Sequence, residues 1–151
     1  MKRLANEYFE RVYSQDADPW GFETRRYEER KYALTLAVLP RARYTRAFEP
    51  GCSFGVLTEL LAPRCDALIA SEVVPSVTAR ARKRLERYAH VDVDVGAIPD
   101  VWPGGTFDLV VLRQEHDIVD VNYENVGRAR AHGIRDVLRR FLHATRRACG
   151  S

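Results

Sequence analysis

Long apolar runs are absent from the sequence of 151 residues. No stretch of about 18 apolar residues occurs, so no segment is expected to span a membrane. The N-terminal sequence MKRLANEYFERVYSQ is amphipathic and charged, and it lacks the apolar centre of a secretion signal. These absences predict a cytoplasmic protein without a membrane partner.

Cysteine is scarce, and its spacing is uninformative. Cys52, Cys65 and Cys149 form no Cys-x-x-Cys motif, and no paired histidines accompany them. An odd number of cysteines in this arrangement favours neither a disulfide framework nor structural zinc. We therefore predict no metal site.

Blocks of one charge sign are also absent. The 24 Lys and Arg residues are mixed with 21 Asp and Glu residues, for a net charge of +3. Without a basic cluster, nucleic acid is not an expected partner. The slight excess of positive charge would suit an anionic small substrate.

What is present is material for one globular core. Hydrophobic residues make up 46% of the chain and charged residues 30%, which is ordinary for a soluble domain. A length of 151 residues fits a single domain, so residues 1–151 are treated as one unit.

Strand-like and helix-like segments alternate from residue 44 onward. Short apolar or alternating runs predict strands at 46–49, 67–72, 91–95 and 107–112, and helical patterns occupy 56–61 and 75–85. Strands that alternate with helices predict a parallel sheet with right-handed crossovers. The predicted fold class is therefore α/β, with a Rossmann-like parallel sheet.

Two helices are predicted before the first strand. A helix over residues 3–14 rests on apolar residues at helical spacing, namely Leu4, Tyr8, Phe9 and Val12. A second periodic stretch stops at Pro40 and contains Tyr27, Ala33, Leu34, Ala37 and Val38. The chain thus divides into N-terminal helices (1–43), a core (44–112) and a C-terminal segment (113–151), where an apolar stripe predicts one helix through Arg147.

The turn between the first strand and the next helix is rich in small residues. Gly51 and Gly55 allow the chain to turn and bring main-chain N–H groups close to a ligand, and Ser53 adds a small hydroxyl. Ser53 replaces the middle glycine of the Gly-x-Gly-x-x-Gly dinucleotide motif, which argues against an NAD-dependent oxidoreductase. An ordinary tight turn is the plain alternative.

An acid ends the second predicted strand about twenty residues after this turn. At this position of Rossmann-like sheets, an acid such as Glu72 accepts hydrogen bonds from ribose hydroxyls. A solvated surface acid is the alternative for Glu72 taken alone. The spacing from strand to loop to acid favours an adenosine site.

The segment FEPGCSFGVLTELLAPRCDALIASEVVPSVTARARKRL, followed by FDLVVL, resembles class I S-adenosylmethionine-dependent methyltransferases. The segment YFERVYSQDADPWGFETRRYEERKYALTLAVLP is similar to the nodulation protein S family, whose best-known member N-methylates a chito-oligosaccharide precursor. This resemblance covers residues 5–112. It implies S-adenosylmethionine as cofactor and a small-molecule acceptor, such as an amino sugar or an oligosaccharide amine.

The resemblance also implies a cofactor site made of three segments. The glycine loop would lie beside the methionine part, the end of the second strand would hold the ribose, and the segment after the third strand would flank adenine. The residues concerned are Glu49, Gly51, Ser53 and Gly55 in the loop, Glu72 with Val73, and Ala97 with Ile98. In many relatives an acid reaches the adenine amino group at this position, but Ala97 and Ile98 are not acids, so backbone groups are expected to recognise adenine.

The N-terminal helices are expected, by the same resemblance, to cap the cofactor. Trp20 would form a wall of the pocket and Lys31 would pair with the methionine carboxylate. A plain packing aromatic is an equal alternative for Trp20. A solvated helix face is the favoured alternative for Lys31.

Methyl transfer requires alignment of the reacting groups and exclusion of water more than it requires catalytic side chains. His116, just past the fourth predicted strand, is the candidate general base because histidine titrates near neutrality. A surface histidine is the favoured alternative.

The sequence departs from its apparent relatives after Leu112. They continue with three further strands, whereas this sequence predicts one more helix, so the C-terminal strands are expected to be missing and one sheet edge to be exposed. A truncated or frame-shifted product, a degenerate paralogue and a homodimer that completes the sheet are all compatible with this pattern. The alternative function is therefore an inactive S-adenosylmethionine-binding or interaction module.

Overall fold

The computed structural model describes residues 2–16, 18–19, 21–22, 25–98 and 101–112. Four strands form one sheet, β1 (Tyr44–Pro50), β2 (Cys65–Glu72), β3 (Val91–Val95) and β4 (Leu109–Val110). The helices are α1 (Lys2–Gln15), α2 (Arg26–Val38), α3 (Val56–Leu61) and α4 (Pro75–Leu85), and a 3-10 turn, η1, follows α3 at Ala62–Arg64.

All strand pairs are parallel, and the strand order is β3-β2-β1-β4. The chain adds β2 and β3 on one side of β1 and then returns to place β4 on the other side. The predicted α/β class with a Rossmann-like parallel sheet is confirmed. This reversal beside β1 is the switch point at which open α/β sheets bind ligands.

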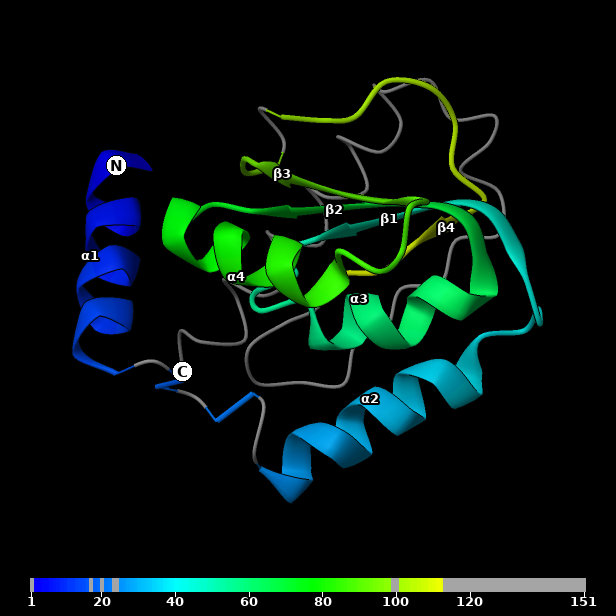
Figure 1. Ribbon diagram of the computed structural model, residues 1–151, viewed down its shortest axis with the longest axis horizontal. Coiled ribbons are helices and arrows are strands. Elements are labelled where there is room, and N and C mark those ends of the chain that lie inside the picture. The colour runs from blue at the N-terminus through cyan, green and yellow to red at the C-terminus, as the bar shows by residue number, and fades with distance from the viewer. Residues whose placement is uncertain (1, 17, 20, 23–24, 99–100, 113–151) are drawn as a thin grey trace, which may run out of the picture.

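Helices cover one face of the sheet. Figure 1 shows α3 and α4 against the sheet and α2 beyond α3, while α1 stands at the end where the strands terminate. Alternate strand residues, such as Ala47 and Leu68, bury their side chains on this face with Leu57 and Leu61 of α3.

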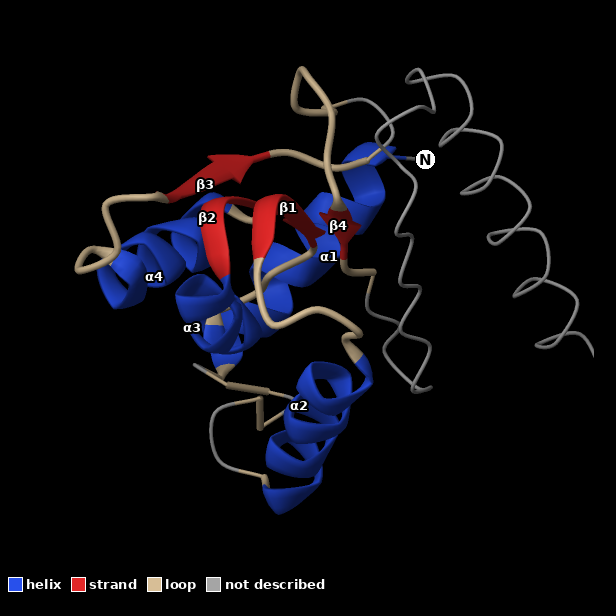
Figure 2. Cartoon of the chain, turned by 90° about the vertical axis from the view of Figure 1, so that its right-hand side faces the viewer, coloured by secondary structure: helices blue, strands red, loops and turns tan. Residues whose placement is uncertain are grey.

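The opposite face carries an aromatic cluster. Phe48 of β1 packs against Trp102 and Phe107, with ring centroids 5.0 Å and 5.5 Å away. The loop that supplies Trp102 and Phe107 connects β3 to β4 on the side of the sheet away from α3 and α4 (Figure 2). The described core thus has two layers with the sheet between them.

The residues at both ends of α4 favour a helix. Pro75 begins the helix, where its fixed φ is compatible and its missing N–H is not needed. Arg82, Lys83 and Arg84 lie in the last turn, where positive charge complements the helix dipole. The prediction of a helix over 75–85 is confirmed.

Helix α2 has the predicted position but buries a different face. The predicted apolar residues are exposed: Tyr27, Ala33, Leu34, Ala37 and Val38. The buried face instead contains Glu28, Lys31, Tyr32 and Thr35. Tyr32 reaches the core beside α3, and the polar groups are satisfied locally, because Thr35 Oγ1 donates to the Lys31 carbonyl.

Strand β4 is shorter than the predicted strand over 107–112. Backbone bonds extend its pairing by one residue at each end, since Asp108 N–H donates to the Arg46 carbonyl and Val111 N–H to the Phe48 carbonyl. The Asp108 carboxylate accepts the N–H groups of Thr45 and Arg46, each at 2.8 Å. This carboxylate anchors the start of β4 to β1.

No helix in the described part of the chain is both long and apolar enough to cross a membrane. Cys52 and Cys65 are both buried. Burial raises the pKa of Cys65 to about 12, so this side chain remains a protonated, unreactive thiol near neutral pH.

Candidate functional site

Three of the predicted site segments lie at one edge of the sheet. The glycine loop follows β1, Glu72 ends β2, and Gly96 to Ile98 follow β3. Because these parallel strands are neighbours, their carboxyl ends meet at the same edge. The Gly96 N–H donates to the Glu72 carbonyl at 2.9 Å, which joins the second segment to the third.

The glycine loop turns through left-handed backbone. Gly51 and Gly55 have φ values of 75° and 76°, and both N–H groups at Gly51 and Cys52 donate to the Ser71 carbonyl of β2. A Cβ added at Gly51 would meet no atom within 4 Å, whereas one at Gly55 would come within 3.0 Å of Leu85. Gly55 therefore serves helix packing, and Gly51 faces open space.

Glu72 is buried, and its carboxylate joins two turns. Oε2 accepts the Ser53 N–H at 3.0 Å, and Oε1 accepts the N–H groups of Val73 and Val74 at 2.8 Å and 3.2 Å. The alternative of a solvated surface acid is wrong, because the residue is only 7% exposed. A carboxylate has about four acceptor sites, so it retains capacity for a ligand hydroxyl.

The electrostatics of Glu72 reflect this burial. Desolvation raises the pKa of the carboxyl, and the three N–H donors partly offset that effect because they favour the ionised form. A hydroxyl pair of a ribose would add donors to the same carboxylate. The group is thus suited to accept hydrogen bonds from a bound sugar.

Glu49 lies beneath the loop. It is fully buried, and its Oε2 accepts the Thr58 hydroxyl of α3 at 2.7 Å. This contact ties the end of β1 to the first turns of α3. Glu49 is therefore a support for the loop, and any role toward the methionine part of a ligand is a proposal.

The segment after β3 provides backbone and a small apolar surface. Ala97 is exposed, and Ile98 packs partly buried against the aromatic cluster of Phe48 and Phe107. Ala97 and Ile98 directly follow Gly96, whose N–H donates to the Glu72 carbonyl, which is the order that an adenine pocket after a ribose site would require. The side chains of Ala97 and Ile98 carry no polar group, and recognition of adenine by backbone groups stays a prediction.

The N-terminal region touches the glycine loop, and residues that the sequence analysis did not select make the contact. Tyr13 of α1 and Phe22 pack edge-on against Phe54, with ring centroids 5.4 Å and 6.5 Å away. Tyr13 lies outside the predicted apolar stripe of α1, and Tyr8, which belongs to that stripe, is 50% exposed. No local pattern identifies Tyr13, because its partner is 41 positions away.

The remaining predicted N-terminal residues have different outcomes. Trp20 lies outside the described residues, although its neighbours Gly21 and Phe22 are described. Lys31 is buried, so the solvated helix face is wrong. Its ammonium is 3.9 Å from Glu28 Oε1 and 6.0 Å from the ring centroid of Tyr27, both within α2, so these contacts do not join Lys31 to the glycine loop.

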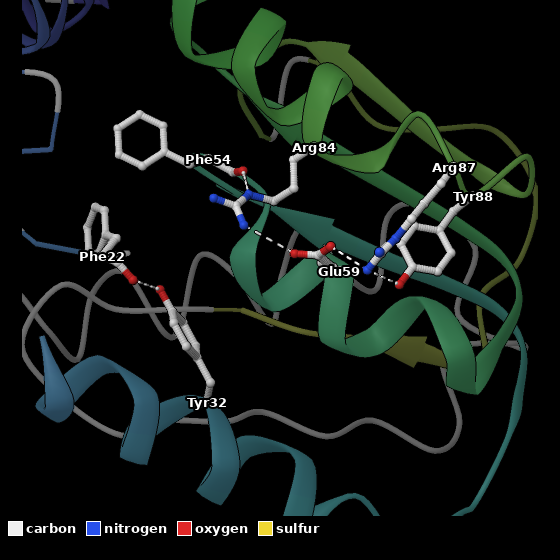
Figure 3. A network of polar contacts seen from close by, with 7 residues as sticks. All are labelled: Phe22, Tyr32, Phe54, Glu59, Arg84, Arg87 and Tyr88. Atoms are coloured by element: carbon white, nitrogen blue, oxygen red, sulfur yellow. Dashed lines mark hydrogen bonds and ion pairs between the residues drawn. The ribbon is translucent and has the colours of Figure 1, made fainter. Parts of the chain in front are cut away.

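An arginine network holds the loop to the helices behind it (Figure 3). Arg84 of α4 donates to the Phe54 carbonyl at 3.0 Å and to Glu59 of α3 at 3.1 Å. Arg87 donates to the other Glu59 oxygen at 2.7 Å and to the Tyr88 hydroxyl at 2.9 Å. The loop backbone is therefore fastened to both α3 and α4.

One further feature lies away from this edge. An open groove follows the outer strand β3, between α4 and the sheet, with Arg82, Tyr88 and Asp92 in its lining. Within the described residues, no group of three His, Cys, Asp or Glu side chains could hold a metal ion. His116 and the predicted helix through Arg147 lie outside the described residues.

The arrangement is suited to an adenosine ligand without phosphates. Three features lie along one edge: a carboxylate at the end of β2, an open approach to the Gly51 backbone, and the backbone and small apolar side chains of Ala97 and Ile98 after β3. The loop departs from the phosphate-binding glycine pattern at Ser53. Residues present at this edge thus fit a ribose and an attached neutral base.

Comparisons with known proteins agree on one family. The family model described as Nodulation protein S (NodS) matches residues 5–137. Nodulation protein S of Sinorhizobium fredii is 33% identical over 98 residues, which are 64% of this chain and 45% of the relative. The protein of the same name from Bradyrhizobium diazoefficiens is 32% identical over 72% of this chain and 52% of its own length.

Solved structures give the same result. The N-methyltransferase NodS of Bradyrhizobium japonicum WM9, in complex with S-adenosyl-l-homocysteine, is 30% identical, with a TM-score of 0.64 over 70% of this chain and 54% of that chain. A Pseudomonas syringae protein described as a methyltransferase is 46% identical, with a TM-score of 0.55 over 62% of this chain and 60% of that chain. The chain spans about half the length of the curated relatives it matches.

Proposed function

The chain belongs to the nodulation protein S family of class I methyltransferases, and from this premise we propose that it transfers a methyl group from S-adenosylmethionine to a small-molecule acceptor. One observation supports the cofactor most directly. The end of β2 presents a buried carboxylate at Glu72, directly beside a glycine loop whose Gly51 faces open space.

Each segment of the edge has a proposed part in holding the cofactor. Glu72, with Val73 beside it, would accept the ribose hydroxyls, since its carboxylate has acceptor capacity beyond its three backbone donors. The backbone at Gly51 and Ser53 would lie along the methionine part. Ala97 and Ile98 would flank adenine. Trp20 would form a wall of the pocket, and Lys31 would pair with the methionine carboxylate.

The cofactor carries its methyl group on a positively charged sulfur. When the methyl group is transferred, a neutral thioether leaves, and it needs no acid to do so. The task of the chain is to hold methyl and acceptor in line, about 3–3.5 Å apart, and to keep water out. A rigid loop fastened by Arg84 and Glu72 is suited to that task, because a small displacement of the bound cofactor would misalign the methyl group.

We propose a nitrogen acceptor on an amino sugar or an oligosaccharide. The support is the related structure named N-methyltransferase NodS, together with the family resemblance. An ammonium acceptor must lose a proton before it can attack, so a general base would assist the reaction. His116 remains the proposed base.

Calorimetric titration with S-adenosylhomocysteine tests the cofactor proposal. Wild-type protein is expected to bind, Glu72→Ala to lose binding, and Gly51→Ala to bind weakly, because its new methyl group would enter the cofactor space. Gly104→Ala is the control for the added methyl group, since a Cβ there also meets no atom within 4 Å and the residue lies in the loop before β4, where its carbonyl accepts a hydrogen bond from Arg46. It does not reproduce the strain that alanine would have at the left-handed φ of Gly51, so the melting temperature of Gly51→Ala is compared with that of wild type. Circular dichroism checks that each variant is folded.

The competing function from the sequence analysis is an inactive S-adenosylmethionine-binding module, which membership of a methyltransferase family does not favour. Incubation with labelled S-adenosylmethionine and a panel of amino sugars separates the two. Labelled product identifies a methyltransferase. Tight binding of the cofactor without any labelled product would identify the inactive module.

A further inference from the structure

The hydroxyl of Tyr13 meets the glycine loop directly. Tyr13 lies in α1, and its hydroxyl oxygen is 3.2 Å from Ser53 Oγ across a partly buried contact. The two residues are 40 positions apart in the sequence. This hydrogen bond joins the N-terminal helix to the segment that would lie along the methionine part of the cofactor.

Ser53 is an unusual residue for its backbone conformation. Its φ of 51° lies in the left-handed region, which glycine adopts without steric strain and other residues adopt uncommonly. Both ends of the residue are held, because the N–H donates to Glu72 Oε2 and the hydroxyl pairs with Tyr13. A serine with its side chain engaged therefore occupies a position that backbone geometry alone would give to glycine.

Aromatic packing around Phe54 aligns the same helix. Phe54 is 1% exposed, and the rings of Tyr13 and Phe22 pack against it at 76° and 65°. The Tyr32 hydroxyl of α2 donates to the Phe22 carbonyl at 3.3 Å (Figure 3). Elements before β1 thus converge on the residue next to Ser53.

We propose that Tyr13 is a positioning residue for cofactor binding: it acts through the Ser53 hydroxyl to hold the glycine loop in its binding conformation. This inference rests on the proposed function, because it concerns the same cofactor site. The Phe54 cluster places the Tyr13 ring, and the hydroxyl then selects one orientation of Ser53. Docking of α1 and affinity for the cofactor are therefore coupled.

The hydroxyl of Ser53 explains why glycine is absent here. Glycine would relax the backbone but would leave the Tyr13 hydroxyl without this partner and the loop without its link to α1. Ser53→Gly is therefore expected to unfold at the same temperature as wild type or higher, and yet to bind S-adenosylhomocysteine more weakly. If Ser53 had a purely structural role, its substitution would not weaken binding while leaving the unfolding temperature unchanged or higher.

A double-mutant cycle tests the coupling. S-adenosylhomocysteine affinity is measured by calorimetry for wild type, Tyr13→Phe, Ser53→Gly and the double variant. Loss of one net hydrogen bond weakens binding roughly three- to tenfold, so each single variant is expected to show that loss. The double variant is expected to show no further loss, because both changes remove the same contact. Tyr8→Phe, the same change at a half-exposed position of α1, is the control and is expected to bind as wild type does.

The outcomes separate this inference from the proposed function. If folded wild type fails to bind S-adenosylhomocysteine, the proposed function fails and the inference fails with it. If wild type binds and Tyr13→Phe binds equally well, only the role of Tyr13 is refuted. Losses that add in the double variant would also refute it, since independent effects need no hydrogen bond between the two residues.

Discussion

At the scale of single residues, Glu72 combines a structural role with a proposed binding role. Its carboxylate accepts N–H groups from the glycine loop and from the start of α4, so it joins two turns of the fold. The same group lies where a ribose would be held. Loss of Glu72 is therefore expected to affect both the loop and the ligand.

A pH dependence follows from the burial of Glu72. Burial raises the pKa of its carboxyl in the free protein, and ribose hydroxyls that donate to the ionised form would lower that pKa again. Binding of S-adenosylhomocysteine is thus expected to release protons near the raised pKa. Affinity should fall as the pH is lowered through that value, approaching tenfold per pH unit below it.

Calorimetry in two buffers of different ionisation enthalpy measures the proton release. Glu72→Gln, which cannot titrate, is expected to bind more weakly and to lose the pH dependence. Proton release that is unchanged in this variant would assign the effect to another group. In the free protein the raised pKa of Glu72 has the opposite consequence, since its cost to stability disappears as the pH falls toward the ordinary value of 4.5.

At the scale of secondary-structure elements, the join between β1 and β4 depends on side chains from both strands. Arg46 donates to the carbonyls of Gly104 and Thr106, and its guanidinium lies 4.4 Å from the ring centroid of Phe107. Asp108 fastens the backbone of Thr45 and Arg46. These contacts compensate for a strand pairing of only two register positions.

Asp108→Ala is expected to destabilise the protein by about 1.5–3 kcal/mol, because two hydrogen bonds to a charged group are lost where the side chain is only 26% exposed. Urea unfolding measures the change in the free energy of unfolding. Asp66→Ala is the control, since its ion pair with Arg43 is exposed and is worth at most about 1 kcal/mol. Equal losses in the two variants would contradict this role for Asp108.

Most element boundaries followed from local sequence, whereas the buried face of α2 did not. Periodicity favours Leu34 and Val38, but both are exposed, and Tyr32 occupies the core position instead. Arg64 also contributes, because its guanidinium donates to carbonyls at the end of α2, including that of Leu36 at 2.7 Å. Because α2 has polar and apolar residues on several faces, its own sequence does not decide which face is buried. Contacts with residues distant in sequence decide it.

At the scale of the whole molecule, the described fold has the parallel sheet of a class I methyltransferase and the edge at which we propose that the cofactor binds. The strand order β3-β2-β1-β4 includes the switch point beside β1, and the N-terminal helix reaches the loop that follows β1. The chain covers between 41% and 52% of the three nodulation protein S relatives. Cofactor binding can therefore be tested separately from acceptor turnover.

Thermal unfolding distinguishes the proposed cofactor from a dinucleotide. At 100 times its dissociation constant, S-adenosylhomocysteine is expected to stabilise the protein by about 2.7 kcal/mol, which raises the melting temperature by roughly 5–10 °C. NAD at the same concentration is expected to cause no shift, because the loop has Ser53 in place of the second dinucleotide glycine. A comparable shift with NAD would favour the oxidoreductase interpretation.

The sequence by itself determined the alternation of strands and helices, the glycine turn, the position of Glu72 at a strand end and the family. These features are local, since each depends on the spacing of residues within one segment. Only the tertiary structure decided that Glu72 is buried against Ser53, that Lys31 lies inside α2's buried face and that Tyr13 reaches the loop. Those contacts join residues from different elements, and they form only when the packing of the whole core brings the elements together.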